Sequence, residues 1–280
     1  MIEEFISSWE LFHLSFLAGW FSSLCLPLAG MLLVAKRQVF LGAALSQASI
    51  FGISFILVLD IMEFGGLDQE MISHGASVLF SLLGALLVFQ LARKNRTHNE
   101  ISSLVFLFCA SSAILLVSGS PHGTEEVHAI TASTLLGATS HDVWILLATL
   151  LGLVGIILRK KREIGLYLLD SDTAGAVGLN LKRWDLYSAA AVGFVVGFCL
   201  KVTGFLFVFG FLILPVLSAR EIIKRFWALP MTSCLISFTA CTLAYFISVY
   251  HDLPPAQVAV FSLCLFWFLA MAWRKMMLRN

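Results

Sequence analysis

The sequence predicts an all-α fold, a polytopic transmembrane helical bundle with eight or nine spans. Of its 280 residues, 59% are hydrophobic and 12% are charged, whereas an ordinary soluble domain carries about 25% charged residues. The mean hydropathy is +0.93. Because one span needs about 20 apolar residues, the chain has room for nine spans with about a third of its length left for loops. This composition excludes a soluble enzyme, a disordered protein, a disulfide scaffold and a nucleic-acid-binding domain.

Nine apolar stretches are the expected spans. Two of them, 186–201 and 204–219, are short and separated by a brief break, so we interpret them as short or broken helices as readily as two full crossings. The complete set covers residues 14–35, 38–59, 74–92, 101–118, 143–158, 186–201, 204–219, 230–249 and 256–273.

Two prolines lie in the middle of predicted spans. Pro27 and Pro215 each remove one helical N–H, which leaves the carbonyl of Ser23 or Phe211 without its usual partner. We expect a kink at each proline, and a carbonyl that lines a cavity is the alternative.

The basic residues sort to one side of the predicted membrane. When the loops are assigned alternately to the two sides, every Lys and Arg except Lys201 falls on one side, and most acidic residues fall on the other. Loops rich in Lys and Arg are typical of the cytoplasmic side. We therefore expect the N-terminus to be external, the C-terminus to be cytoplasmic, and the number of spans to be odd.

The segment 163–185 belongs to the longest polar stretch between spans, and it lies on the basic side. Asp170 or Ser171 is suited to cap a short helix that runs to about Val177, and Gly178 is suited to end it. A short helix at this place is a natural dock for a soluble partner, and a helix that merely lies at the interface is the alternative. The sequence has no GxxxxGK(S/T) motif, so ATP-driven transport would require a second chain that binds the nucleotide.

Four stretches carry motifs that occur together in one family. Lys36–Ala48 is a basic turn followed by Gly-Ala-Ala-Leu-Ser-Gln-Ala, and Asp170–Leu179 reads Asp-x-Asp-x-Ala-x-x-x-Gly-Leu. Lys201–Ala219 holds a Thr-Gly-Phe-Leu-Phe-Val run and a later Pro-Val-Leu-Ser-Ala, and Tyr250–Ala256 reads Tyr-His-Asp-Leu-Pro-Pro-Ala, with Ala256 where the family has glycine. In this order and topology, the chain resembles the membrane (permease) subunits of bacterial ABC importers for zinc, manganese and iron.

The resemblance implies a single transmembrane permease domain over residues 1–280, with a coupling segment at about 163–185, in the bacterial inner membrane. The chain is then no enzyme and binds no cofactor; its cargo is a divalent metal ion, and ATP is bound by a partner. The implied partners are an ABC ATPase subunit, a periplasmic or extracellular metal-binding protein, a second permease subunit and membrane lipid, but no nucleic acid. The family's coupling helix, which presses against the ATPase, is matched here by Asp170, Asp172, Ala174, Gly178 and Leu179.

The family's metal-binding pair is absent from this chain. In the family, an Asp and a His four residues later project from the second span into the transport path; the matching positions here are Ala43 and Gln47. Ala43 offers no ligand atom, and Gln47 offers only a neutral carbonyl oxygen, which binds zinc less well than imidazole. Three interpretations are open. A different permease subunit supplies the ligands, a homodimer forms a weakly coordinating conduit, or the cargo is a metal chelate or another small solute.

Other side chains carry atoms that suit a metal. Weak candidates for ligands are His251, Asp252, His122 and His128. The first two lie at an expected external turn, where a loop role competes with a gate role, and the other two lie in the external stretch 119–142, which a solvated acidic loop explains equally well. His74 is spaced to pair with Glu70 at the mouth of a span.

Two other classes of function remain to be weighed. A membrane enzyme would need a nucleophile, a carboxylate pair or a metal motif within the spans, and the spans contain no such set. A non-transporting membrane scaffold fits the composition, but it would not need the segment 163–185.

Overall fold

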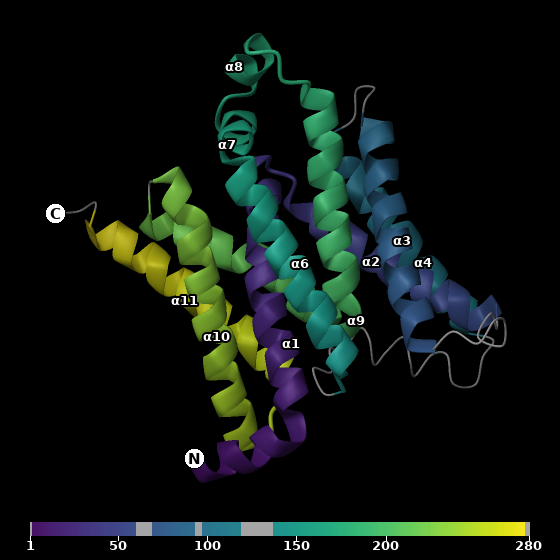
Figure 1. Ribbon diagram of the computed structural model, residues 1–280, viewed down its shortest axis with the longest axis vertical. Helices are drawn as coiled ribbons and strands as arrows, with labels where there is room; N and C mark the ends of the chain where they lie inside the picture. Colours follow the sequence, from purple (N-terminus) through teal and green to yellow (C-terminus); the bar gives the residue numbers. More distant parts are fainter. Residues whose placement is uncertain (1, 60–68, 93–96, 119–136, 224, 278–280) are drawn as a thin grey trace.

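The computed structural model describes residues 2–59, 69–92, 97–118, 137–223 and 225–277. Every regular element in these ranges is a helix, and eight helices are long and apolar enough to cross a membrane (Figure 1). The predicted all-α transmembrane fold is thus confirmed. The elements are α1 (Ile2–Ala35), α2 (Val39–Leu59), α3 (Gln69–Leu91), α4 (His98–Val117), α6 (Ser140–Arg159), α7 (Lys161–Leu169), α8 (Ser171–Ala176), α9 (Leu181–Ile222), a 3-10 turn (Phe226–Ala228), α10 (Leu229–His251) and α11 (Pro255–Met277).

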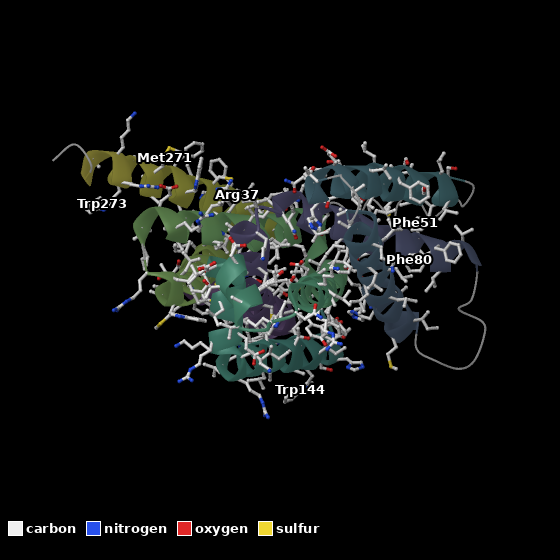
Figure 2. The ribbon with its side chains drawn as sticks, turned by 90° about the horizontal axis from the view of Figure 1, so that it is seen from above. Arg37, Phe51, Phe80, Trp144, Met271 and Trp273 are labelled. Carbon is white, nitrogen blue, oxygen red and sulfur yellow. The ribbon has the colours of Figure 1, made fainter. Side chains whose placement is uncertain are left out.

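The outside of the bundle is apolar and its interior holds many small polar side chains. Trp144 of α6 is 68% exposed, and Figure 2 places Trp144, Met271 and Trp273 at the rim of the bundle. Lipid chains surround such side chains as favourably as a protein core does, so close packing and interhelical hydrogen bonds hold the helices together. Small residues permit that packing, and the buried hydroxyls include those of Ser22, Ser46, Ser49, Ser77, Ser81, Ser233 and Ser237.

The helix α9 reverses within the bundle at Gly204. This residue has φ 76° and ψ 172°, a backbone conformation that is essentially restricted to glycine. The leg before it, residues 181–203, is about 34 Å long at 1.5 Å per residue, which is enough to cross the hydrocarbon core. The predicted stretches 186–201 and 204–219 are therefore two legs of one 42-residue element.

Both ends of α9 lie beside the turn that joins α1 to α2. Near the start of α9, Asp185 accepts a hydrogen bond from Tyr167, and the ammonium group of Lys36 in the turn lies over the Tyr167 ring. Near the end of α9, Arg220 lines a groove together with Arg37 of the same turn. The second leg thus returns to the end of the bundle from which the first leg started.

We call this end of the molecule the basic end. It carries Lys36, Arg37, Lys161, Arg183 and Arg220, and the last turn of α11 joins it through an ion pair of 2.7 Å between Arg274 and Glu221. The spans of α1 and α6 begin at the other end of the bundle, which we call the opposite end. There the backbone N–H of Gly137 donates to the hydroxyl of Ser15 at 3.3 Å. The span of α1 therefore begins at the opposite end and α11 finishes at the basic end, while the expected odd number of crossings and the orientation in the membrane stay predictions.

The second leg of α9 packs against α1 at backbone distance. A Cβ atom added to Gly30 would lie 1.7 Å from the carbonyl oxygen of Leu212, and one added to Gly42 of α2 would lie 2.3 Å from the Leu212 side chain. Only glycine permits α1 and α9 to approach so closely, which makes the second leg the centre of the bundle.

Pro27 leaves an unpaired carbonyl inside α1, and another helix supplies the missing donor. The hydroxyl of Ser237 on α10 donates to the carbonyl oxygen of Ser23 at 2.5 Å, and both side chains are fully buried. A backbone acceptor in lipid has no water to bond, so this interhelical bond satisfies a group that would otherwise be costly to bury. The helical hydrogen bond that Pro27 removes is thus replaced by a hydrogen bond that connects α1 to α10.

Replacing Gly30 by alanine is expected to destabilise the bundle by about 3 kcal/mol or more, because the new methyl group would overlap backbone that cannot rotate away. The measurement is the thermal unfolding midpoint of the purified protein in detergent. Gly152→Ala on α6 is the matched control, because a Cβ there meets nothing within 4 Å. Equal midpoints for the two variants would contradict the close approach of α1 and α9.

Replacing Ser237 by alanine is expected to cost about 1 to 3 kcal/mol, because it leaves the Ser23 carbonyl buried without a donor. Thr239→Ala is the control, since that exposed hydroxyl bonds only to carbonyl groups of its own helix. The unfolding midpoints of the two variants are measured in the same detergent. If Thr239→Ala lowers the midpoint as much as Ser237→Ala does, the bond between α1 and α10 has no special stabilising role.

Candidate coupling and transport site

The chain between α6 and α9 forms two short helices at the basic end, and Figure 1 shows α8 standing beyond the ends of the spans, with α7 below it beside the first turns of α9. Asp170 begins α8. Its carboxylate accepts hydrogen bonds from the backbone N–H groups of Asp172 at 3.2 Å and Thr173 at 3.0 Å, and from the Thr173 hydroxyl at 2.5 Å. The bonds from Thr173 lower the pKa of the Asp170 carboxyl. Asp170 is therefore an ionised N-cap, a common way to start a short helix.

The end of α8 is set by Gly178. It has φ 89°, and the backbone N–H of Leu179 donates to the carbonyl of Ala174 at 3.0 Å, the bond that closes a helix whose next residue is left-handed. Ala174 is fully buried, while Asp172 is exposed. The five residues expected to form the coupling segment thus lie on one capped helix or at its ends. Their contact with an ATPase stays a prediction.

The base of the projection formed by α7 and α8 is a partly buried polar cluster around the buried Tyr167, which the sequence analysis did not identify. The hydroxyl of Tyr167 on α7 donates to Asp185 Oδ1 at 2.5 Å and lies 3.2 Å from the hydroxyl of Ser188, both on α9. Lys36 Nζ lies 3.8 Å from the centroid of the Tyr167 ring. Burial raises the pKa of the Tyr167 hydroxyl, and burial lowers the pKa of Lys36 while Asp185 acts to raise it. The sequence offered one signal for this cluster, which is that Tyr167 is the single polar aromatic residue in the otherwise apolar run from 164 to 169.

The two positions that match the family's metal ligands are buried in α2. Ala43 is 2% exposed and Gln47 is 8% exposed, so both face the interior of the bundle and not the lipid. The hydroxyl of Ser46 beside them donates to the carbonyl of Gly42 within the same helix at 3.0 Å. Within the part of the chain that the structure describes, no three His, Cys, Asp or Glu side chains come together to hold a metal ion.

His74 is buried near the opposite end of the bundle, and its partner is Asp142. His74 Nε2 on α3 contacts Asp142 Oδ1 on α6, and the other Asp142 oxygen accepts from the backbone N–H and hydroxyl of Thr139 at 2.9 and 3.0 Å. The sequence spacing suggested Glu70 as the partner, whose side chain lies outside the described residues. The structure instead joins two helices that are 68 residues apart in sequence, which no local pattern could indicate.

The remaining ligand candidates do not gather into a site. His251 and Asp252 are both exposed at the end of α10, where Asp252 has φ 52° and its backbone N–H bonds to the carbonyl of Ser248. This geometry ends a helix and accounts for the loop role. His122 and His128 lie outside the described residues.

The chain is similar to several proteins of metal transport systems. A family model described as "ABC 3 transport family" matches residues 8–274. The chain is 24% identical over 241 residues to the "Probable metal transport system membrane protein" of Treponema pallidum, covering 86% of this chain and 87% of that protein. It is 22% identical over 253 residues to the "High-affinity zinc uptake system membrane protein ZnuB" of Buchnera aphidicola, covering 88% and 93%. The structure of PsaBC from Streptococcus pneumoniae in complex with Fab shares the fold over 100% of both chains, with a TM-score of 0.82 and 18% identity.

Replacing His74 by leucine is expected to destabilise the protein by about 1.5 to 3 kcal/mol, because the Asp142 carboxylate stays buried and loses a hydrogen-bond partner. His141→Ala is the control, as this neighbouring histidine is exposed. The unfolding midpoints of both variants in detergent test the pair. If the His74→Leu variant is as stable as the native chain, the contact between His74 and Asp142 does not stabilise the fold.

Proposed function

Because the chain belongs to the ABC 3 transport family, we propose that it is the membrane-spanning subunit of an ATP-binding-cassette importer for divalent metal ions, with zinc, manganese or iron as cargo. ATP binding and hydrolysis then take place on a separate ATPase subunit, because this sequence has no phosphate-binding loop of the GxxxxGK(S/T) type.

The observation that carries this proposal is the capped helix α8 at the basic end. α8 packs against α7 and against the start of α9. α7 follows directly on the span α6, and the start of α9 is the beginning of that helix's first leg. A helix with an exposed side and firm attachment to two spans is suited to receive a soluble ATPase. Closure of the ATPase on ATP would displace α8, and the attached spans would rearrange so that the path opens alternately to each side.

The charge distribution supports one orientation in the membrane. An excess of Lys and Arg is typical of the cytoplasmic side, so the basic end faces the cytoplasm and the ATPase in this proposal. The opposite end then faces the periplasm or the exterior, where a metal-binding protein delivers the cargo. We place the protein in the inner membrane of a bacterium as one permease domain.

The transport path in this proposal runs partly along α2. Since Ala43 has no donor atom and Gln47 has only an amide, a related second permease subunit supplies the ligands that this chain lacks. A path needs ions to leave as well as to bind, so one weakly binding half is compatible with transport. A metal chelate is the second candidate cargo, because a solute that carries its own ligands would need none at these two positions.

The function is tested by metal uptake. Cells that lack the gene, and the same cells with the gene restored, are assayed with radioactive zinc, manganese and iron, free and as citrate chelates. Restoration of uptake of one free ion supports the proposal, restoration with a chelate alone supports the second candidate, and equal uptake in both strains contradicts transport. Co-purification of an ATPase subunit separates a transporter from a membrane scaffold.

Asp170→Ala is expected to reduce metal uptake several-fold, because α8 loses its N-cap and with it the shape that the ATPase contacts. Asp170→Asn is the matched control, since asparagine caps helices as well as aspartate does, and it is expected to retain most of the uptake. Uptake and the amount of co-purified ATPase are measured for both. Full uptake in Asp170→Ala would remove the coupling role from α8.

A further inference from the structure

We propose that Tyr167 is a positioning residue that passes the displacement of α8 to the start of the path helix α2. The inference rests on the proposed coupling role of α8 and assigns the residue through which coupling reaches the membrane. Two contacts of Tyr167 carry it, one made by its hydroxyl and one by its ring.

The hydroxyl of Tyr167 connects α7 to the start of α9, at the base of the projection that α7 and α8 form. Tyr167 lies three residues before the N-cap Asp170, and its partner Asp185 lies in the first turns of α9. The bond between them joins residues 18 apart, so the whole of α8 is enclosed in the loop that it closes. With this bond in place, α7 and the start of α9 move together, and a push on α8 displaces the base as one body.

The ring connects that base to the turn between α1 and α2. Lys36 Nζ lies 3.8 Å from the ring centroid, within the range in which an ammonium group is attracted to an aromatic face. α2 begins three residues later, at Val39, and carries Ala43 and Gln47 in its first turns. The turn is itself well defined, because the backbone N–H of Gln38 bonds to the carbonyl of Leu33 at 2.8 Å.

A purely space-filling role does not account for this arrangement. Tyr167 is 1% exposed, and burial of a hydroxyl is unfavourable unless its hydrogen bonds are made; a phenylalanine would fill the same space without that requirement. A cavity of about 90 Å³ adjoins Tyr167 and is lined by residues of α1, α6, α7 and α9, among them Met31 and Ser188. The base is therefore less closely packed against α1 at this place than a protein interior usually is.

The experiment uses the complete transporter in proteoliposomes, that is, this chain with its ATPase subunit and its binding protein, and measures metal ions transported per ATP hydrolysed. Tyr167→Phe keeps the ring under Lys36 and removes the bond to Asp185. We expect transport per ATP to fall roughly three- to tenfold, the equivalent of one hydrogen bond, while assembly and ATP hydrolysis stay at the native level. Tyr187→Phe is the control, because it removes an exposed hydroxyl from the same region of α9, and its ratio is expected to stay native.

A second variant keeps the test decisive if Tyr167→Phe assembles poorly. Asp185→Ala removes the other partner, and the same loss of transport per ATP is expected, with no further loss in the double variant. A native ratio in either single variant, or additive losses in the double variant, would overturn the inference. A native complex that transports no metal would instead refute the proposed function, so the two failures are distinguishable.

Discussion

The structure depends on one constraint, which is that backbone polar groups within lipid must find partners inside the protein. Straight helices meet it by themselves, and each departure from a straight helix therefore requires a specific device. At Pro27 the device is the Ser237 hydroxyl, which reaches across from α10 to the freed carbonyl of Ser23. At the reversal of α9 it is Gly204, whose conformation permits the change of direction without a polar loop. Both devices lie in the interior of the bundle.

The part of the chain that the proposed function requires to move is built differently from the part that must stay in place. The second leg of α9 contacts α1 at a distance that only Gly30 allows, so these helices cannot shift independently. By contrast, α8 has six residues, stands beyond the ends of the spans and is attached through α7 and the start of α9. Motion at α8 can therefore reach the spans as a displacement of the projection's base, without disturbing the central packing.

Sequence patterns were sufficient for the spans and for the capped helix because both arise from local chemistry. Long apolar runs predict spans wherever they occur, and Asp170 and Gly178 have the residue types that start and end a helix regardless of their surroundings. The reversal at Gly204 was partly foreseen, since two short stretches with a brief break suggested a broken helix, but its direction needed the contacts of Asp185 and Arg220.

Contacts between distant segments could not be predicted in the same way. His74 contacts Asp142 on another span, and Tyr167 contacts Lys36, which lies in a turn 131 residues earlier in the chain. The packing of the whole bundle determines which of these residues are neighbours. The residue types alone show that Ala43 has no ligand atom and that Gln47 has only a neutral amide oxygen. Their place in the interior was expected only from the resemblance, and the structure buries both side chains.

The reversal of α9 also determines what the molecule displays to its surroundings. Thr203 and Gly204 are buried and both ends of the helix lie at the basic end, whereas Lys201 and Leu206 beside the reversal keep some exposure. The element that packs against most of the other helices is thus largely enclosed by them where it turns, and the charged side chains that it exposes, Lys182, Arg183 and Arg220, lie at the basic end.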